Sequence, residues 1–161
     1  MLTIRKAELH EASVLTEIAF AAKRHWKYPE SYYEIWKDEL TITQEYITSN
    51  IVYVAVFENI VVGFYSIVEN KEAFWAGEVY VEKAFWLEHV FILPEYHKKG
   101  IGTELIKHTL NVMHDNAIPE CLIFVDPFAT GFYEKVGARF IRNSKSSIKG
   151  REIPVFALMN N

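Results

Sequence analysis

The sequence is poor in the features that would place it in a secreted or membrane-bound class. Its 161 residues include one cysteine, Cys121, so no disulfide can form within the chain and a reducing compartment fits best. The longest apolar runs, such as Ile51–Phe57, fall far short of the roughly 20 residues that a membrane helix needs. We therefore expect a cytoplasmic protein with no membrane partner.

Basic residues are also in the minority. Lys and Arg number 17 against 21 Asp and Glu, which gives a formal net charge of −4. Duplex nucleic acid binds through many basic contacts to its phosphates, so we expect no nucleic-acid partner. A cationic or amine-bearing partner suits this balance better. Because no repeat, low-complexity stretch or linker interrupts the chain, residues 1–161 are predicted to form a single domain.

Hydrophobic periodicity predicts a mixed α/β (α+β) fold. Helical stripes favour helices over residues 9–24, from Pro29 to Leu40, over 101–115 and over 128–136, with a further short turn of helix capped by Thr43. Runs rich in β-branched and aromatic residues favour strands over 2–6, 51–58, 61–74, 79–92, 121–125, 138–145 and 152–159. The strands over 61–74 and 79–92 are interpreted as one long hairpin that turns at Ala76-Gly77, with the start of a longer loop at this turn as the alternative. This order predicts a mixed sheet with helices on both faces.

The most informative segment follows the strand that ends at Ile92. A glycine-containing turn leads straight into the next helix, so free N–H groups and the helix dipole face the turn. Gly100 and Gly102 would let an anion approach the backbone closely, and Lys98 and Lys99 add positive charge. The pattern indicates an anion site, although a turn that binds no ligand is the simpler alternative. It lacks the third glycine of a dinucleotide fold and the Gly-Lys-Ser/Thr of a P-loop.

This segment resembles motif A of the GNAT superfamily of acyl-CoA N-acyltransferases, Arg/Gln-x-x-Gly-x-Gly/Ala after a strand and a turn similar to Pro94–Tyr96. Gly100 and Gly102 match the motif. His97 stands in the Arg/Gln position, where it can still donate a hydrogen bond. The resemblance implies that acetyl-CoA binds along this segment, with its pyrophosphate on the backbone amides of residues 98–103. The implied contacts are Val90, Ile92, His97, Lys98, Lys99, Gly100, Ile101, Gly102 and Thr103.

A second stretch, Ala129–Ala138, resembles the family's Ala-x-x-Phe-Tyr-x-x-x-Gly-Phe segment and departs from it at Ala138. Asp126 falls where many members have an asparagine that touches the cofactor. The resemblance therefore implies cofactor contacts from Asp126, Ala129 and Phe132. Together the two motifs and the element order cover nearly the whole chain. They imply a GNAT-like, mostly antiparallel central sheet of about seven strands flanked by about four helices.

The implied reaction is direct acyl transfer, in which an amine attacks the thioester carbonyl and CoA leaves as a thiolate. Tyr133 matches the position whose hydroxyl protonates the leaving sulfur in many relatives. Composition alone favours a core tyrosine on a short helix, and the flanking Phe132 and Gly137 of the motif reverse that preference. The resemblance also implies that the backbone N–H of Val90 polarises the carbonyl.

The strand that precedes the glycine loop holds two candidates for the base that takes the proton of the acceptor's ammonium group. Glu88 shares one face of this alternating strand with Trp86, whereas His89 shares the other face with Phe91. A carboxylate in so apolar a strand is costly unless it is paired, hydrated or used. The resemblance also implies a Glu or His on this strand and puts Glu88 on the face that relatives use, so Glu88 is the first candidate. His89 is the second, because its ordinary pKa suits proton transfer. An ion-paired glutamate and a core histidine are the simpler alternatives, and a bulge would exchange the two faces.

An aromatic cluster falls in the segment that forms one wall of the acceptor pocket in relatives: Trp26, Tyr28, Tyr33 and Trp36. These rings could hold an amine by cation–π contact, or they could simply pack between helices. The remaining histidines show no metal-ligand spacing, so no metal is expected.

Two functions remain open at this point. The first is an N-acetyltransferase that moves an acetyl group from acetyl-CoA to a primary amine of a small molecule, with peptide or protein amines as further acceptors. The second is a non-catalytic acyl-CoA-binding or regulatory module that keeps the fold. The resemblance also allows the chain to form a homodimer with a second copy of itself.

Overall fold

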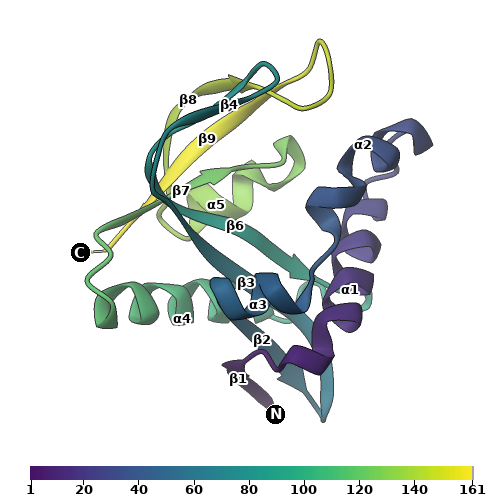
Figure 1. Cartoon of the computed structure of the whole chain (residues 1–161). Coiled ribbons are helices and arrows are strands. Elements are labelled where there is room, and N and C mark those ends of the chain that lie inside the picture. Colours follow the sequence, from purple (N-terminus) through teal and green to yellow (C-terminus); the bar gives the residue numbers. More distant parts are fainter. Residues whose placement is uncertain (161) are drawn as a thin grey trace. The chain divides into compact units, whose positions relative to one another are not determined.

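The computed structural model describes residues 1–160 as a mixed α/β fold (Figure 1). The strands are β1 (Leu2–Lys6), β2 (Ile51–Phe57), β3 (Ile60–Asn70), β4 (Phe74–Ala76), β5 (Val79–Val81), β6 (Ala84–Ile92), β7 (Glu120–Phe124), β8 (Arg139–Lys145) and β9 (Glu152–Met159). The α-helices are α1 (Ala12–Arg24), α2 (Glu30–Leu40), α3 (Gln44–Ser49), α4 (Ile101–Asp115) and α5 (Thr130–Lys135). Short 3₁₀ turns are η1 (Leu9–Glu11), η2 (Pro94–Tyr96) and η3 (Pro127–Ala129).

The sheet confirms the fold class expected from the sequence. Over the described residues, seven strands follow the order β1-β2-β3-β6-β7-β9-β8, and β4 pairs with β5 in a separate ribbon. The β1–β2, β2–β3, β7–β9 and β8–β9 pairs are antiparallel, whereas β6 and β7 are parallel. Five α-helices accompany these strands in that part of the chain, because the turn expected after Thr43 forms the separate helix α3. No helix among residues 1–160 combines the length and apolarity needed to cross a bilayer.

The described residues pack into two compact units. The first comprises Met1–Ile67 and His89–Thr109, and the second comprises Val68–Glu88 and the chain from Leu110 onward. Strands β3 and β6 and helix α4 each contribute residues to both units. Each unit is therefore built from segments that lie far apart in the sequence.

In the first unit, a turn, a helix cap and the buried face of a helix lie where the sequence predicts them. Glu58 and Asn59 join β2 to β3 with φ of 49° and 68°, the two positive values that a type I′ hairpin turn requires. The Thr43 hydroxyl accepts the Tyr46 N–H at 3.0 Å and caps α3, as expected. Helix α1 buries one stripe of its surface, which consists of Leu15, Ile18, Ala19 and Ala22. This helix begins at Ala12, three residues after the predicted start, because Leu9–Glu11 forms a 3₁₀ turn.

Strands β3 and β6 approach each other unusually closely at Gly63. A Cβ atom at this position would lie 2.7 Å from the Phe91 carbonyl oxygen and 3.2 Å from Ile92 Cγ1. We therefore expect Gly63→Ala to lower the free energy of unfolding by about 1–3 kcal/mol, since backbone must move to admit the methyl group. Chemical denaturation measures this change. Gly131→Ala is the matched control, because nothing lies within 4 Å of that position; an equal loss in both variants would contradict the steric explanation.

A partly buried hydrogen bond joins β3 to α4 inside the first unit. The Tyr65 hydroxyl lies 2.8 Å from His108 Nδ1, and the Tyr53 ring stacks on Tyr65 at 5.6 Å. Burial lowers the pKa of His108, so the ring stays neutral and Nδ1 can accept the hydroxyl proton. The fold therefore depends on a neutral imidazole at this position.

This arrangement predicts a pH dependence of stability. Because the pKa of His108 is lower in the folded chain, the unfolded chain takes up the proton first as the pH falls through about 6.5, and stability is lost below that pH. We expect His108→Gln to remove this part of the slope in denaturation curves measured from about pH 7 to 5. His114→Gln, at an exposed position, should leave the slope unchanged. A wild-type slope in the His108 variant would contradict the prediction.

The second unit corrects the long hairpin predicted over 61–74 and 79–92. Strand β3 ends at Asn70, the β4–β5 ribbon intervenes, and β6 starts only at Ala84. The Asn70 side-chain amide donates to the Glu82 carbonyl at 2.8 Å, and the Trp86 indole N–H donates to the same oxygen at 3.0 Å. These bonds close the base of the ribbon. The end of β3 was not predicted because the segment is rich in aromatic residues, and the residues that end the strand, such as Asn70, differ from it only in being polar.

Strand β7 confirms the expectation of a strand buried on both faces, with Cys121 fully buried. Burial raises the pKa of Cys121 to about 12, so its thiol is unreactive at neutral pH. The helix predicted over 128–136 is shorter and consists of η3 followed by α5. Gly137 ends it with φ of 94°, while the next amide, Ala138 N–H, donates to the Tyr133 carbonyl at 3.0 Å.

Candidate active site

The glycine loop in the first unit has the geometry of an anion site. The η2 turn brings the chain from the end of β6 to His97, and Lys98 and Gly100 then take positive φ values of 63° and 79°. The N–H of Glu104 donates to the Gly100 carbonyl at 3.1 Å, which marks the first turn of α4. The three preceding amides therefore have no acceptor within the helix and point out of its N-terminus; they belong to Ile101, Gly102 and Thr103.

The rim of this loop carries the charge that the sequence predicts. Lys98, Lys99 and Gly100 are exposed, whereas Ile101 is buried and anchors the first turn of α4. Helix α4 spans 15 residues, so its dipole contributes partial positive charge at this end. The loop can accordingly bind an anionic group through backbone donors, with two lysines close in sequence.

The side chain of His97, expected from the sequence to contact the cofactor, makes two contacts within the chain. Its ring Nε2 lies 3.3 Å from the carbonyl oxygen of Ile92, and its ring meets the His25 ring edge-on at 5.0 Å. Both partners belong to the first unit. The side chain therefore contacts the protein itself at the position where the family motif has Arg or Gln.

The two candidate bases on β6 lie in very different surroundings. Glu88, in the second unit, is exposed, so water hydrates its carboxylate. The desolvation cost that singled out Glu88 in the sequence is therefore absent. His89, in the first unit, is 4% exposed and packs among aromatic rings, with Phe91 at 5.3 Å and Phe64 and Tyr46 each at 6.1 Å.

The aromatic cluster of α1 and α2 is largely a packed interior. Tyr33 and Trp36 are buried, whereas Trp26 and Tyr28 are half-buried. Cations of the chain itself cover three of the rings: Lys23 Nζ lies 4.5 Å from the Trp36 centroid and 5.7 Å from that of Tyr28, and Arg24 Cζ lies 4.3 Å from that of Tyr33. Cation–π contacts therefore exist here within the chain, while Trp26 and Tyr28 keep part of their surface exposed.

The second predicted segment lies entirely in the second unit. Asp126 caps η3, because its Oδ1 accepts the Phe128 N–H at 3.0 Å, and its Oδ2 lies 3.9 Å from Arg151 Nη2. Tyr133 is 7% exposed, and its ring meets the Phe132 ring edge-on at 5.1 Å. Burial raises the pKa of Tyr133 well above its ordinary value, so the phenol keeps its proton. Ala129 is half-buried at the junction between η3 and α5.

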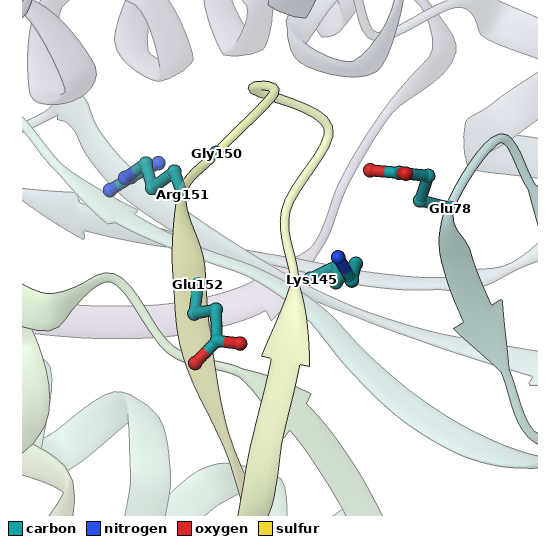
Figure 2. A pocket seen from close by; sticks show the side chains of 5 residues that line it. All are labelled: Glu78, Lys145, Gly150, Arg151 and Glu152. Carbon is teal, nitrogen blue, oxygen red and sulfur yellow. The ribbon is translucent and has the colours of Figure 1, made fainter.

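A cleft of about 360 Å³ opens between the β4–β5 turn and the β8–β9 hairpin, also in the second unit (Figure 2). Glu78 faces it from the turn, and the hairpin contributes the remaining lining: Lys145, Gly150, Arg151 and Glu152. Charged residues of both signs therefore line one cleft, although the Arg151 guanidinium points away from Glu78 (Figure 2) and lies 3.9 Å from Asp126 Oδ2. None of these residues was singled out in the sequence, because their proximity depends on the ribbon and on the pairing of Lys145 with Glu152 across β8 and β9.

The described residues contain one group that could hold a metal ion, contrary to the expectation from histidine spacing. Ligand atoms of Glu8, His10 and Glu11 lie within 4.8 Å of one another. However, both oxygens of the Glu11 carboxylate accept hydrogen bonds from Arg5, at 2.8 and 3.0 Å. Arg5 lowers the pKa of Glu11, and the ion pair accounts for this buried carboxylate without a metal.

The comparisons with known proteins give the family. Residues 19–138, about three quarters of the chain, match the model of the acetyltransferase (GNAT) family. The chain therefore belongs to the acetyltransferase (GNAT) family, and the resemblance noted in the sequence is confirmed. The match runs through both compact units.

Solved structures with similar folds cover nearly the whole chain. A PaiA N-acetyltransferase from Thermoplasma acidophilum, solved in complex with coenzyme A, is 19% identical, with 99% of each chain covered and a TM-score of 0.73. A GNAT family acetyltransferase from Brucella melitensis, solved in complex with acetyl-CoA, is 21% identical, with 100% of this chain and 89% of that chain covered and a TM-score of 0.65. No curated protein matches the sequence at a significant level.

Proposed function

We propose that this chain is a single-domain N-acetyltransferase that moves an acetyl group from acetyl-CoA to a primary amine of a small molecule. The observation that carries the proposal is the α4 N-terminus, where Gly100 at φ of 79° turns backbone donors outward in a chain of the acetyltransferase family. This geometry suits a diphosphate. Two similar structures are complexes with CoA or acetyl-CoA, which supports the same ligand here.

In this proposal, Val90, Tyr133 and Glu88 each carry out a different step of the reaction. The amine nitrogen attacks the carbonyl carbon of the thioester, the carbon–sulfur bond breaks, and the sulfur leaves with the electron pair. The N–H of Val90 donates to the carbonyl oxygen as charge develops there. Tyr133 gives its phenolic proton to the leaving sulfur and regains a proton from the nitrogen of the new amide; its raised pKa keeps the phenol protonated before the transfer.

Glu88 is the proposed acceptor of the ammonium proton. Its exposure supports this role, because an exposed carboxylate can pass the proton on to water. His89 is a weaker candidate, since its buried ring packs against Phe64 and Phe91. Asp126, Ala129 and Phe132 are proposed to contact the cofactor near Tyr133.

A small acceptor is supported by the cleft in the second unit. Its volume of about 360 Å³ lies at the lower end of the range for small-molecule sites. The net charge of −4 favours cationic substrates in general, while the cleft itself holds charges of both signs, with Glu78 and Glu152 beside Lys145. Trp26 and Tyr28, in the first unit, are separately proposed to offer aromatic surface to a cationic group.

Two measurements test the proposal. Calorimetry with CoA should show binding, and thiol release from acetyl-CoA should rise when members of a panel of small primary amines are added. Absence of CoA uptake by the folded protein would refute the proposed ligand. Binding of CoA without thiol release for any amine would instead favour a non-catalytic acyl-CoA-binding module.

A further inference from the structure

The side chain of His97 makes two contacts within the first unit. The first joins it to the end of β6, where Nε2 lies 3.3 Å from the Ile92 carbonyl oxygen. A carbonyl oxygen only accepts hydrogen bonds, so Nε2 must carry the proton and donate it. This N–H is engaged by the protein, and it is not directed at a ligand of the loop.

This contact lies next to a backbone conformation of the loop that is unfavourable by itself. Directly after His97, Lys98 adopts φ of 63°, a conformation that side-chain-bearing residues rarely take. Such residues persist only where the surrounding structure holds them in place. The His97 main-chain N–H also bonds the Pro94 carbonyl at 3.2 Å, so its backbone is held by the η2 turn and its ring by the end of β6.

The second contact is with the corner that follows helix α1. The His97 ring meets His25 edge-on, with centroids 5.0 Å apart and planes at 84°. His25 in turn packs edge-on against Trp26 at 4.8 Å. Lys27, one residue further, has φ of 57°, so this corner contains the same kind of constrained turn as the loop. His97 therefore lies between the glycine loop and the aromatic surface of Trp26.

We infer that His97 is a positioning residue whose two contacts act separately: its Nε2 hydrogen bond orders the glycine loop for the diphosphate, and its ring holds the His25–Trp26 corner. The inference rests on the proposed function for the ligand of the loop. It differs from a direct cofactor contact because His97 acts on the ligand through Ile92 and the backbone of Lys98.

Two substitutions separate the contacts, with CoA as the probe. His97→Phe keeps a ring for His25 but lacks the donor, so we expect the Kd for CoA to rise about fivefold, the usual effect of one lost hydrogen bond. His97→Gln places an amide donor near the same carbonyl but lacks the ring. Its Kd for CoA should stay within about twofold of wild type. Titration calorimetry measures both values.

The indole N–H resonance of Trp26 in ¹H–¹⁵N spectra reports on the conformation of the His25–Trp26 corner. It is assigned by its loss in Trp26→Phe. This resonance should shift in His97→Gln and not in His97→Phe. His25→Ala, at an exposed position, should reproduce the shift while leaving the Kd for CoA unchanged, and it tests the second contact even if a His97 variant folds poorly.

The outcomes distinguish the inference from the proposed function. Equal weakening of CoA binding by both His97 substitutions would overturn the inference in favour of a direct contact with the cofactor. Unchanged Kd values together with an unchanged Trp26 resonance would overturn it as well. Absence of CoA binding by the wild-type chain would instead refute the proposed function on which the inference rests.

Discussion

Replacing Tyr133 by phenylalanine is expected to lower kcat by a factor of about 10² to 10⁴ while leaving the Kd for CoA within about twofold of wild type. The substitution removes the hydroxyl that would protonate the leaving sulfur. It keeps the ring that packs against Phe132 at 5.1 Å, so the α5 segment should retain its structure. Thiol release with the best amine of the panel measures kcat, and calorimetry measures CoA binding.

The matched control for this prediction is Tyr80→Phe. Tyr80 lies on the β4–β5 ribbon with a partly exposed ring, and loss of its hydroxyl should leave kcat within about twofold of wild type. A Tyr133 variant with the wild-type rate would show that Tyr133 is only a packed core residue. That result would leave the CoA-binding part of the proposal intact.

The raised pKa of Tyr133 extends this prediction to the pH profile. The acid must be protonated to act, and burial moves its deprotonation above the ordinary tyrosine value of about 10. We therefore expect no decline of kcat attributable to Tyr133 between about pH 7 and 9.5. A decline in this range that disappears in Tyr133→Phe would contradict a buried, protonated phenol.

The sequence was most informative where structure depends on neighbours along the chain. The β2–β3 turn follows from Asn59, which tolerates positive φ, and the start of α3 follows from the hydroxyl of Thr43. The end of α5 follows from Gly137 in the same way. The glycine loop belongs to this group, because a strand, a glycine turn and a helix adjoin one another in the sequence. Family membership could therefore be predicted from two short motifs.

Features that depend on distant segments were not predictable. The side-chain bonds of Asn70 and Trp86 to Glu82 separate β3 from the ribbon, and no periodicity reports such bonds. The exposure of Glu88 could not be read from its apolar neighbours, since alternation along a strand does not say what covers each face. The contact of His97 with His25 joins residues 72 positions apart in the sequence. The sequence showed that a histidine occupies position 97 of the glycine-loop motif, but it did not show where the side chain of His97 points.

Gly100→Ala is expected to weaken CoA binding about tenfold. At φ of 79°, an alanine costs roughly 1–2 kcal/mol relative to glycine, and a tenfold change in Kd corresponds to about 1.4 kcal/mol. No atom lies within 4 Å of the added methyl group, so the effect is one of backbone conformation and not of steric conflict with the protein. The loop would relax away from this conformation and turn its donors away from the diphosphate. Calorimetry with CoA measures the loss.

The decisive control is Gly77→Ala, which applies the same strain elsewhere. Gly77 has φ of 62° in the β4–β5 turn, and its surroundings are also open within 4 Å. Both substitutions should therefore cost similar stability, whereas only Gly100→Ala should change the Kd for CoA. Equal CoA affinity in the two variants would mean that the conformation of Gly100 serves only the start of α4. Selective loss in Gly100→Ala would tie ligand binding to the outward-facing amides at that helix terminus, since all other consequences of the added methyl group are shared by the control.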